Sequence, residues 1–460
     1  MSSEPEIERK LSPSEKFHWV IDRESRINFV MHAAVSGILQ EQTIRTALDI
    51  IQRRHPLLRV CIMRTWRGSL RFKSGDIRAI PVRVVGAPAG VCPSGADNPG
   101  FVPEDKWVEE AEREINTPFK SEECPLARCV LIRHGDTKTT VLLTVHHSIG
   151  DGKAGAFLMR DLFRAASKVQ KGESAGLPGL PPRMDMTAYF PGWAKGISGR
   201  LRYIRFGLRV LSAMVRWGAP AMPLVDRKAP VRMRRACIVA KTLNAATVAK
   251  LHKRARIEKT TLHGALIASQ ILAVVHERGS AKELAFIIGS PVNLRARLDP
   301  PVEDDLGLFI TVGISINRAG FSTDFWQLAR EVRQSLLECV ERGDPFVYVM
   351  MHNDLSAVAG LFGSGGVGAR VYTAIAGKLH LGGLAFSNIG RVDIAADHDS
   401  FVVESLGFAA SASGLAVLVP FVATTDTVTT WNFVGMEPLI SREHTARIAD
   451  KACKILIDAI

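Results

Sequence analysis

A predicted strand that runs directly into two histidines constrains this chain more than any other feature. Residues 139–145 are apolar and largely β-branched, which predicts a buried strand. Residues 153–169 repeat apolar side chains at helical spacing, and the segment between them, residues 146–152, has the sequence HHSIGDG. We therefore expect an α/β fold in which His146 and His147 lie at a rigid strand end that faces a cleft.

Three interpretations of this motif compete. A metal site would need a third ligand besides His147 and Asp151, and no HExxH motif or cysteine pair stands nearby, so we expect no metal. An ordinary pair of packed histidines is the second interpretation. The third is a general base, in which one histidine accepts a proton while Asp151 and Gly152 hold the loop in shape. The four motif positions together favour the general base.

The overall charge indicates an acidic partner. The 460 residues carry a formal charge of +13, with a pI near 9.6. This excess suits the phosphates of coenzyme A, an acidic acyl carrier protein or an anionic membrane surface. No arginine-rich segment interleaved with aromatic residues resembles a nucleic-acid module, so we expect no nucleic acid partner. We expect a monomer.

Composition also predicts a cytoplasmic protein. The seven cysteines lack CxxC spacing, and the first ten residues are polar, without the apolar core of a signal peptide. Residues 406–425 carry no charge over about the length of a membrane-spanning helix. They contain glycines and a proline, which favours two buried strands around a turn at 411–414.

Residues 195–217 predict a basic amphipathic helix. One side is an apolar stripe, made of Ile197, Leu201, Ile204, Leu208, Leu211 and Val215. A second face carries the cations Lys195, Arg202, Arg205, Arg209 and Arg216. Two interpretations stay open: peripheral contact with an anionic membrane, or a crossover helix between two lobes with its arginines in solvent.

The motif at residues 146–152 resembles the HHxxxDG signature of the chloramphenicol-acetyltransferase-like superfamily. Its members include peptide-synthetase condensation domains, alcohol acetyltransferases and stand-alone polyketide-associated acyltransferases. A second region agrees, because a predicted strand at 284–290 leads to Arg295 and then to a Leu-Gly turn at 306–307. The resemblance implies that Arg295 pairs with Asp151, which makes Asp151 a scaffold residue and not a member of a catalytic triad.

The sequence AFSNIG at residues 385–390 resembles a Ser-Asn phrase that the polyketide-associated and alcohol acetyltransferase branches carry near the active-site tunnel. Ser387 and Asn388 have side chains that can donate a hydrogen bond to an oxyanion. A plain turn is the alternative, and both interpretations stay open. The plant BAHD phrase DFGWG is absent, which disfavours that branch.

The resemblance implies two α/β lobes with mixed sheets and a tunnel between them. We expect the N-terminal acyltransferase lobe at 1–182, a crossover with the basic helix at 183–234, and the C-terminal acyltransferase lobe at 235–460.

The same resemblance implies acyl transfer from a thioester, either acyl-CoA or an acyl carrier protein, to a hydroxyl of a lipid, polyketide or other secondary metabolite. His147 is the expected base, because the pKa of histidine lies near neutrality, and His146 and Gly152 are expected to shape the loop. We expect no cofactor besides the acyl donor. Two alternatives stay open: a free-standing condensation enzyme that forms amides, and a binding or docking protein that has kept the fold.

Overall fold

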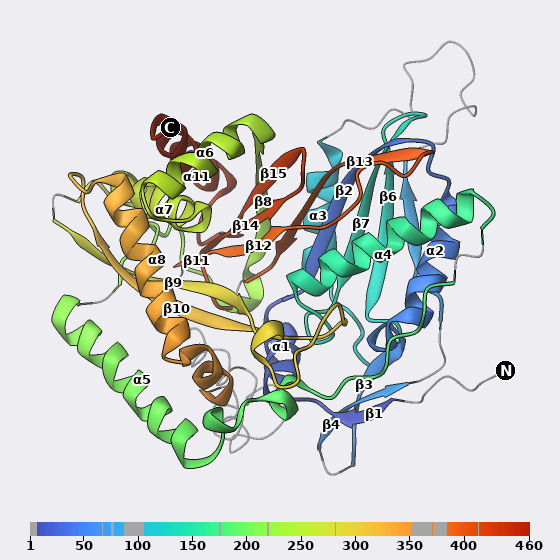
Figure 1. Cartoon of the computed structure of the whole chain (residues 1–460), viewed down its shortest axis with the longest axis horizontal. Helices are drawn as coiled ribbons and strands as arrows, with labels where there is room; N and C mark the ends of the chain where they lie inside the picture. The colour runs from blue at the N-terminus through green and yellow to red at the C-terminus, as the bar shows by residue number, and fades with distance from the viewer. Residues whose placement is uncertain are drawn as a thin grey trace.

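Two β-sheets, each covered by helices, form two lobes that lie side by side (Figure 1). The computed structural model describes residues 7–66, 68–74, 78–86, 105–173, 176–218, 220–280, 282–351, 370, 384–412 and 414–460. The predicted two-lobed α/β fold is confirmed.

The first lobe is built on a five-stranded sheet in the order β13-β2-β7-β6-β5. Its strands are β2 (Phe29–Gly37), β5 (Val82–Val85), β6 (Ala127–Arg133), β7 (Lys138–Val145) and β13 (Phe401–Ala410). Neighbouring strands are antiparallel except β5 and β6. Helices α2 (Glu41–Arg54) and α4 (Gly152–Gln170) pack together on one face, where Gly155 of α4 lies against Phe29 and Met31. Helix α3 (Lys106–Asn116) covers the other face, where Trp107 stacks on His32.

A small sheet and a capped helix lie below this lobe in Figure 1. The sheet comprises β1 (Glu8–Lys10), β4 (Leu70–Ser74) and β3 (Val60–Arg64). Helix α1 (Pro13–Glu24) begins with a capping box, in which the Ser12 side chain accepts from the Glu15 N–H and the Glu15 side chain accepts from the Ser12 N–H. This cap fixes where α1 starts and therefore which of its side chains face the lobe interface.

The second lobe is built on a seven-stranded sheet in the order β10-β9-β11-β14-β15-β8, with β12 paired to β14. Its strands are β8 (Arg235–Asn244), β9 (Leu284–Asn293), β10 (Ile310–Ala319), β11 (Leu384–Ala385), β12 (Ser387–Arg391), β14 (Leu418–Thr424) and β15 (Val428–Glu437). Its helices are α6 (Ala245–Ile257), α7 (Leu262–Arg278), α8 (Phe325–Glu341) and α11 (Arg442–Asp458).

Short 3₁₀ turns occur along the chain between these elements. They are η1 (Pro56–Arg59), η2 (Met186–Tyr189), η3 (Gly192–Ala194), η4 (Val231–Met233) and η5 (Arg295–Arg297).

Strand β13 returns from the second half of the chain to the first lobe. It pairs with β2, from Phe401 opposite Gly37 to Ala410 opposite Phe29, and forms one edge of that sheet. The expected lobe boundary at residue 235 did not include this crossing. The two strands predicted within residues 406–425 are present, as the end of β13 and as β14, but they belong to different sheets. The polypeptide therefore passes from one lobe to the other between the end of β13 and the start of β14.

The predicted basic helix is present as α5 (Gly196–Trp217), which stands at the edge of the molecule (Figure 1). Among the residues that the structure describes, no helix is both long enough and apolar enough to cross a bilayer.

Candidate active site

The motif lies where the sequence predicted it, between strand β7 and helix α4. The strand ends at Val145, the two histidines follow, and α4 begins at Gly152. Asp151 is the N-cap residue of α4, and its Oδ1 accepts a hydrogen bond from the Ala154 N–H at 2.8 Å. The strand end and the helix cap thus fix both ends of the loop that carries His147.

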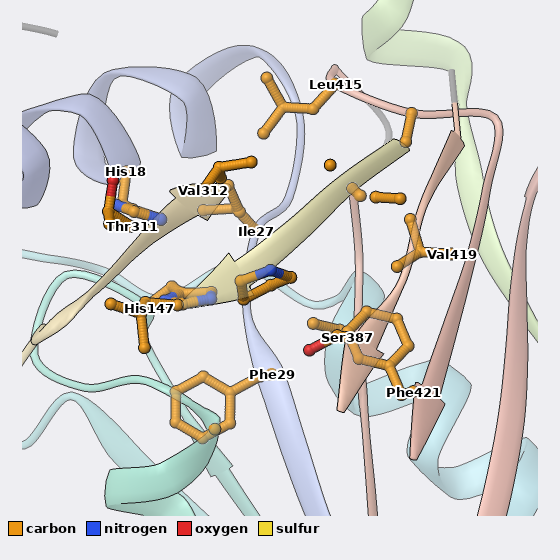
Figure 2. Close-up of a pocket in the computed structure, with 18 of the residues that line it drawn as sticks. His18, Ile27, Phe29, His147, Thr311, Val312, Ser387, Leu415, Val419 and Phe421 are labelled. Atoms are coloured by element: carbon orange, nitrogen blue, oxygen red, sulfur yellow. The ribbon is translucent and has the colours of Figure 1, made fainter. Parts of the chain in front are cut away.

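A cavity of about 170 Å³ opens between the lobes in front of His147 (Figure 2). The first lobe and α1 contribute part of its wall, and strands β9, β10, β11, β12 and β14 of the second lobe contribute another part. Tyr348 and four residues between β13 and β14 complete it: Ser411, Ala412, Leu415 and Ala416. The apolar lining side chains include Phe17, Ile27, Phe29, Ile287, Ile310, Val312, Leu384, Phe408, Leu415, Val419 and Phe421. Few polar side chains reach the cavity: Ser14, His18, His147, Thr311, Tyr348, Ser387 and Ser411. Such a lining favours an apolar ligand with its reacting group held at a few polar points.

His147 is half-buried and projects into this cavity. Burial lowers the pKa of its imidazole below the ordinary value; the carbonyl groups of His147 and Gly150 and the carboxylate of Asp151 oppose this effect only in part. The imidazole is therefore neutral near pH 7. A neutral imidazole can accept a proton from a substrate, as general-base chemistry requires.

His18 stacks on His147, a contact that the sequence did not predict. The ring centroids are 4.4 Å apart and the ring planes differ by 26°. On the other side, the Phe29 ring lies edge-on to His147, with centroids 5.2 Å apart, so His147 is held between two rings (Figure 2). Nδ1 of His18 donates to the carbonyl of Ser14 at 2.8 Å. The sequence placed His18 in a predicted helix, but no signal linked that helix to the motif.

His146 is fully buried and does not line the cavity. Its Nδ1 accepts a hydrogen bond from the Ser148 N–H at 3.1 Å, so the ring proton lies on Nε2. Nε2 lies 3.7 Å from a carboxylate oxygen of Asp22, and the Phe119 ring lies edge-on to the imidazole. These contacts support the predicted role of His146 in holding the loop.

Asp151 and Arg295 form the predicted ion pair, which connects the two lobes. Nη1 of Arg295 donates to both carboxylate oxygens of Asp151, at 3.2 and 3.0 Å. The N–H of Phe309 donates to Asp151 Oδ2 at 2.9 Å. Nη2 of Arg295 donates to the carbonyls of Asp305 and Gly307, at 3.3 and 3.2 Å. The side chains of Asp151 and Arg295 are 0% and 4% exposed, so this is a buried and extensively hydrogen-bonded pair.

Gly152 lets α4 approach the second lobe closely. A Cβ atom at this position would lie 3.0 Å from the Phe408 ring and 3.1 Å from a methyl group of Ile389. The lack of a side chain therefore matters for packing around the motif, in agreement with the predicted shaping role.

Ser387 and Asn388 lie on opposite faces of β12, because successive strand residues alternate in direction. Ser387 is buried and lines the His147 cavity (Figure 2). Asn388 instead lines a separate groove beside α6, with Lys253 and Arg256, and its Oδ1 accepts from the Gly390 N–H at 2.7 Å. The prediction that Asn388 belongs to the oxyanion site or tunnel is corrected, since this side chain does not reach the cavity.

Within the described parts of the chain, no cluster of three or more His, Cys, Asp or Glu side chains is arranged to hold a metal ion.

The fold and the site define a two-lobed protein with a histidine at an interlobe cavity. Residues 17–356 match the condensation domain family, and the chain belongs to this family. The superfamily predicted from the HHxxxDG motif is thereby confirmed.

Several curated proteins are similar in sequence. The chain is 28% identical over 324 residues to the phosphinothricin tripeptide synthetase PhsC of Streptomyces viridochromogenes, covering 66% of this chain and 27% of that protein. It is 28% identical over 282 residues to the chondramide synthase cmdD of Chondromyces crocatus, covering 60% of this chain and 6% of that protein. The chain therefore corresponds to only a small part of these relatives.

Solved structures match nearly the whole fold. Polyketide synthase associated protein 5 from Mycobacterium tuberculosis is 17% identical, with a TM-score of 0.66 over 98% of this chain and 99% of that one. TRI3 trichothecene 15-O-acetyltransferase from Fusarium sporotrichioides is 14% identical, with a TM-score of 0.69 over 100% and 96%. At these identities, the likeness concerns the fold.

Replacing either partner of the Asp151–Arg295 pair by alanine should destabilise the protein by about 3–5 kcal/mol, because the other charge stays buried without compensation. Urea unfolding monitored by circular dichroism measures this loss. Lys454→Ala is a control, since it breaks an exposed pair with Asp458 that contributes at most about 1 kcal/mol. If Asp151→Ala and Arg295→Ala had the same unfolding midpoint as the control, the ion pair would not hold the two lobes together.

Proposed function

We propose that this protein transfers an acyl group from a thioester to a hydroxyl, with His147 as the general base and without a covalent acyl-enzyme. The observation that carries the proposal is the neutral, half-buried imidazole of His147 in an apolar cavity between two lobes. The condensation domain family and its acetyltransferase-like structural neighbours support acyl transfer as the reaction class.

The proposed reaction has two steps. His147 accepts the proton of the acceptor hydroxyl as its oxygen attacks the thioester carbonyl, which forms a C–O bond and a tetrahedral oxyanion. The oxyanion collapses, the C–S bond breaks, and the thiolate takes the proton back from the His147 imidazolium. The Ser387 hydroxyl, which faces the cavity, is positioned on the wall to donate a hydrogen bond to the oxyanion. His18 and Phe29 hold the base in one orientation, which favours a productive approach.

The substrates are inferred from the net charge of the chain and from the side chains that line the His147 cavity. We assign the donor to acyl-CoA or an acyl carrier protein, because the chain carries a formal charge of +13 and both donors are anionic. We assign an apolar acyl chain or an apolar acceptor, such as a lipid or polyketide alcohol, because the cavity wall is mainly aliphatic and aromatic. The acyl donor is a co-substrate, and the mechanism requires no cofactor.

Amide formation is the second candidate function. The curated relatives include peptide synthetases, and an amine acceptor would use the same base and the same cavity. The cavity wall offers no described carboxylate to hold an ammonium group, which favours a neutral alcohol as acceptor.

His147→Ala should lower kcat/KM for acyl transfer by about 10²–10⁴-fold while the protein stays folded, because the acceptor would lose its base. Release of free thiol from an acyl thioester measures turnover, and thermal unfolding checks the fold. His276→Ala, which removes an exposed histidine, is the matched control and should retain full activity. Undiminished thiol release by a folded His147→Ala protein would exclude His147 as the base.

The rate should increase with pH through an apparent pKa below about 6.5 and then level off. The sign follows because the neutral imidazole is the active form and burial lowers the pKa of His147. A profile of kcat/KM between about pH 4.5 and 8 tests this, within the range in which the protein remains folded. A midpoint above the ordinary histidine value would contradict the proposed state of the base.

Matched alcohol and amine acceptors of the same carbon chain should separate the two candidate functions. We expect the ester from an isotopically labelled acyl donor to exceed the amide, as measured by mass spectrometry. Amide as the main product would replace the hydroxyl acceptor with an amine and keep the role of His147. Thioester binding without either product, and without thiol release, would support a binding protein instead.

A further inference from the structure

Helix α5 has apolar side chains on two different faces, and the face that contains Phe206 packs against the protein body. Phe206 is buried and packs with Val347 and Tyr348 of the second lobe. Polar contacts fix the same side: Arg202 donates to the carbonyl of Arg342 at 2.8 Å, and Arg209 pairs with Asp344. Two of the predicted arginines therefore bind the protein body and are not free in solvent.

The apolar stripe identified from the sequence faces outward. Its six residues are between 50% and 81% exposed: Ile197, Leu201, Ile204, Leu208, Leu211 and Val215. They follow one another at intervals of four and three residues, so they form a continuous row along the helix. Figure 1 shows α5 at the edge of the molecule. Six large exposed apolar side chains in one row form a patch that a monomeric soluble protein rarely leaves uncovered.

The charges beside the stripe are all positive. Helix α5 contains no aspartate or glutamate. Arg205 and Arg216 are exposed on one flank of the stripe, about 80–100° around the helix, and Arg200 is exposed on the other flank. Amphipathic helices that lie in a membrane interface share this combination of an apolar row and basic flanks.

We propose that α5 lies flat on an anionic membrane surface, with the stripe buried in the interface and the flanking arginines at the lipid phosphates. A second copy of this chain fits the same surface less well. Pairing two stripes would bring their basic flanks together, and α5 has no acidic side chain to offset the repulsion. An anionic lipid surface complements both the apolar row and the charge.

The membrane-facing helix lies close to the His147 cavity, and the role suggested here for this closeness rests on the proposed function. Val312, Ile314 and Tyr348 line the His147 cavity and belong to the cluster that packs against α5. The membrane-facing helix is therefore separated from the substrate cavity by one layer of side chains. An apolar acceptor or acyl chain that partitions into the bilayer would be concentrated next to the site.

Vesicle co-sedimentation tests the proposal with the full chain. We expect binding to vesicles of phosphatidylcholine with phosphatidylglycerol, and much weaker binding to phosphatidylcholine alone. The triple variant Leu201→Asn/Ile204→Asn/Leu208→Asn should bind at least about tenfold more weakly, since binding depends on the buried apolar area. Arg205→Gln/Arg216→Gln should also bind more weakly, and should lose part of the salt dependence.

Two control variants carry the same chemical changes on other surfaces. Ile257→Asn/Leu337→Asn/Ile457→Asn replaces exposed apolar residues of α6, α8 and α11, and Arg232→Gln/Lys250→Gln removes two exposed cations. Both should bind vesicles as the unchanged protein does. Thermal unfolding of every variant should match, because all the substituted side chains are exposed.

The proposal is overturned if the protein binds neither kind of vesicle, or if the stripe variant binds as well as the control. A dimer in sedimentation velocity that the stripe variant dissociates would assign the surface to a second copy instead. Acyl transfer to a water-soluble acceptor separates this proposal from the proposed function. The stripe variant should retain that transfer, whereas His147→Ala should lose it and still bind vesicles.

Discussion

The buried ion pair between Asp151 and Arg295 is the interaction on which the site depends. Burying two charges costs several kcal/mol per ion, and the pair is tolerable only when hydrogen bonds satisfy the remaining atoms. Here the Asp151 carboxylate also accepts from the N–H groups of Ala154 and Phe309, and Arg295 donates to two backbone carbonyls. One carboxylate therefore caps α4, fixes the start of β10 and joins the lobes. The cavity exists between those lobes, so its shape depends on this pair.

The adjacent histidines meet different surroundings, and their proposed roles differ accordingly. His146 turns inward, where Ser148 and Phe119 fix its ring and no substrate can reach it. His147 faces the cavity, where burial keeps the imidazole neutral and two rings hold its plane. A neutral base in an apolar cavity gains reactivity from exclusion of water, which strengthens its interaction with a developing charge. Only His147 is therefore placed to meet a substrate, which is what the proposed division into one base and one scaffold histidine requires.

The sequence predicted correctly those features that depend on neighbouring residues in the chain. The strand before His146 and the helix after Gly152 both follow from side chains within a few residues. It also predicted the Asp151–Arg295 pair, but only through resemblance to a family. It predicted the end of β13 as a strand but missed that β13 joins the sheet of the first lobe, because the strand pattern does not say which sheet receives the strand. It missed His18 and misplaced Asn388, because a stack across the lobe interface and the direction of a side chain depend on tertiary packing.

Helix α5 also shows that a local sequence pattern does not determine how an element packs in the fold. Periodicity correctly identified a helix with a wide apolar side, but periodicity cannot say which part of that side meets the core. The aromatic row with Phe206 packs on the body, since Tyr348 and Val347 offer a matching apolar surface there. The aliphatic row is then left outside, with arginines along both of its edges. In the membrane-bound arrangement proposed above, the exposed row of α5 meets an anionic lipid surface. Its buried row packs against Val312, Ile314 and Tyr348, which line the cavity.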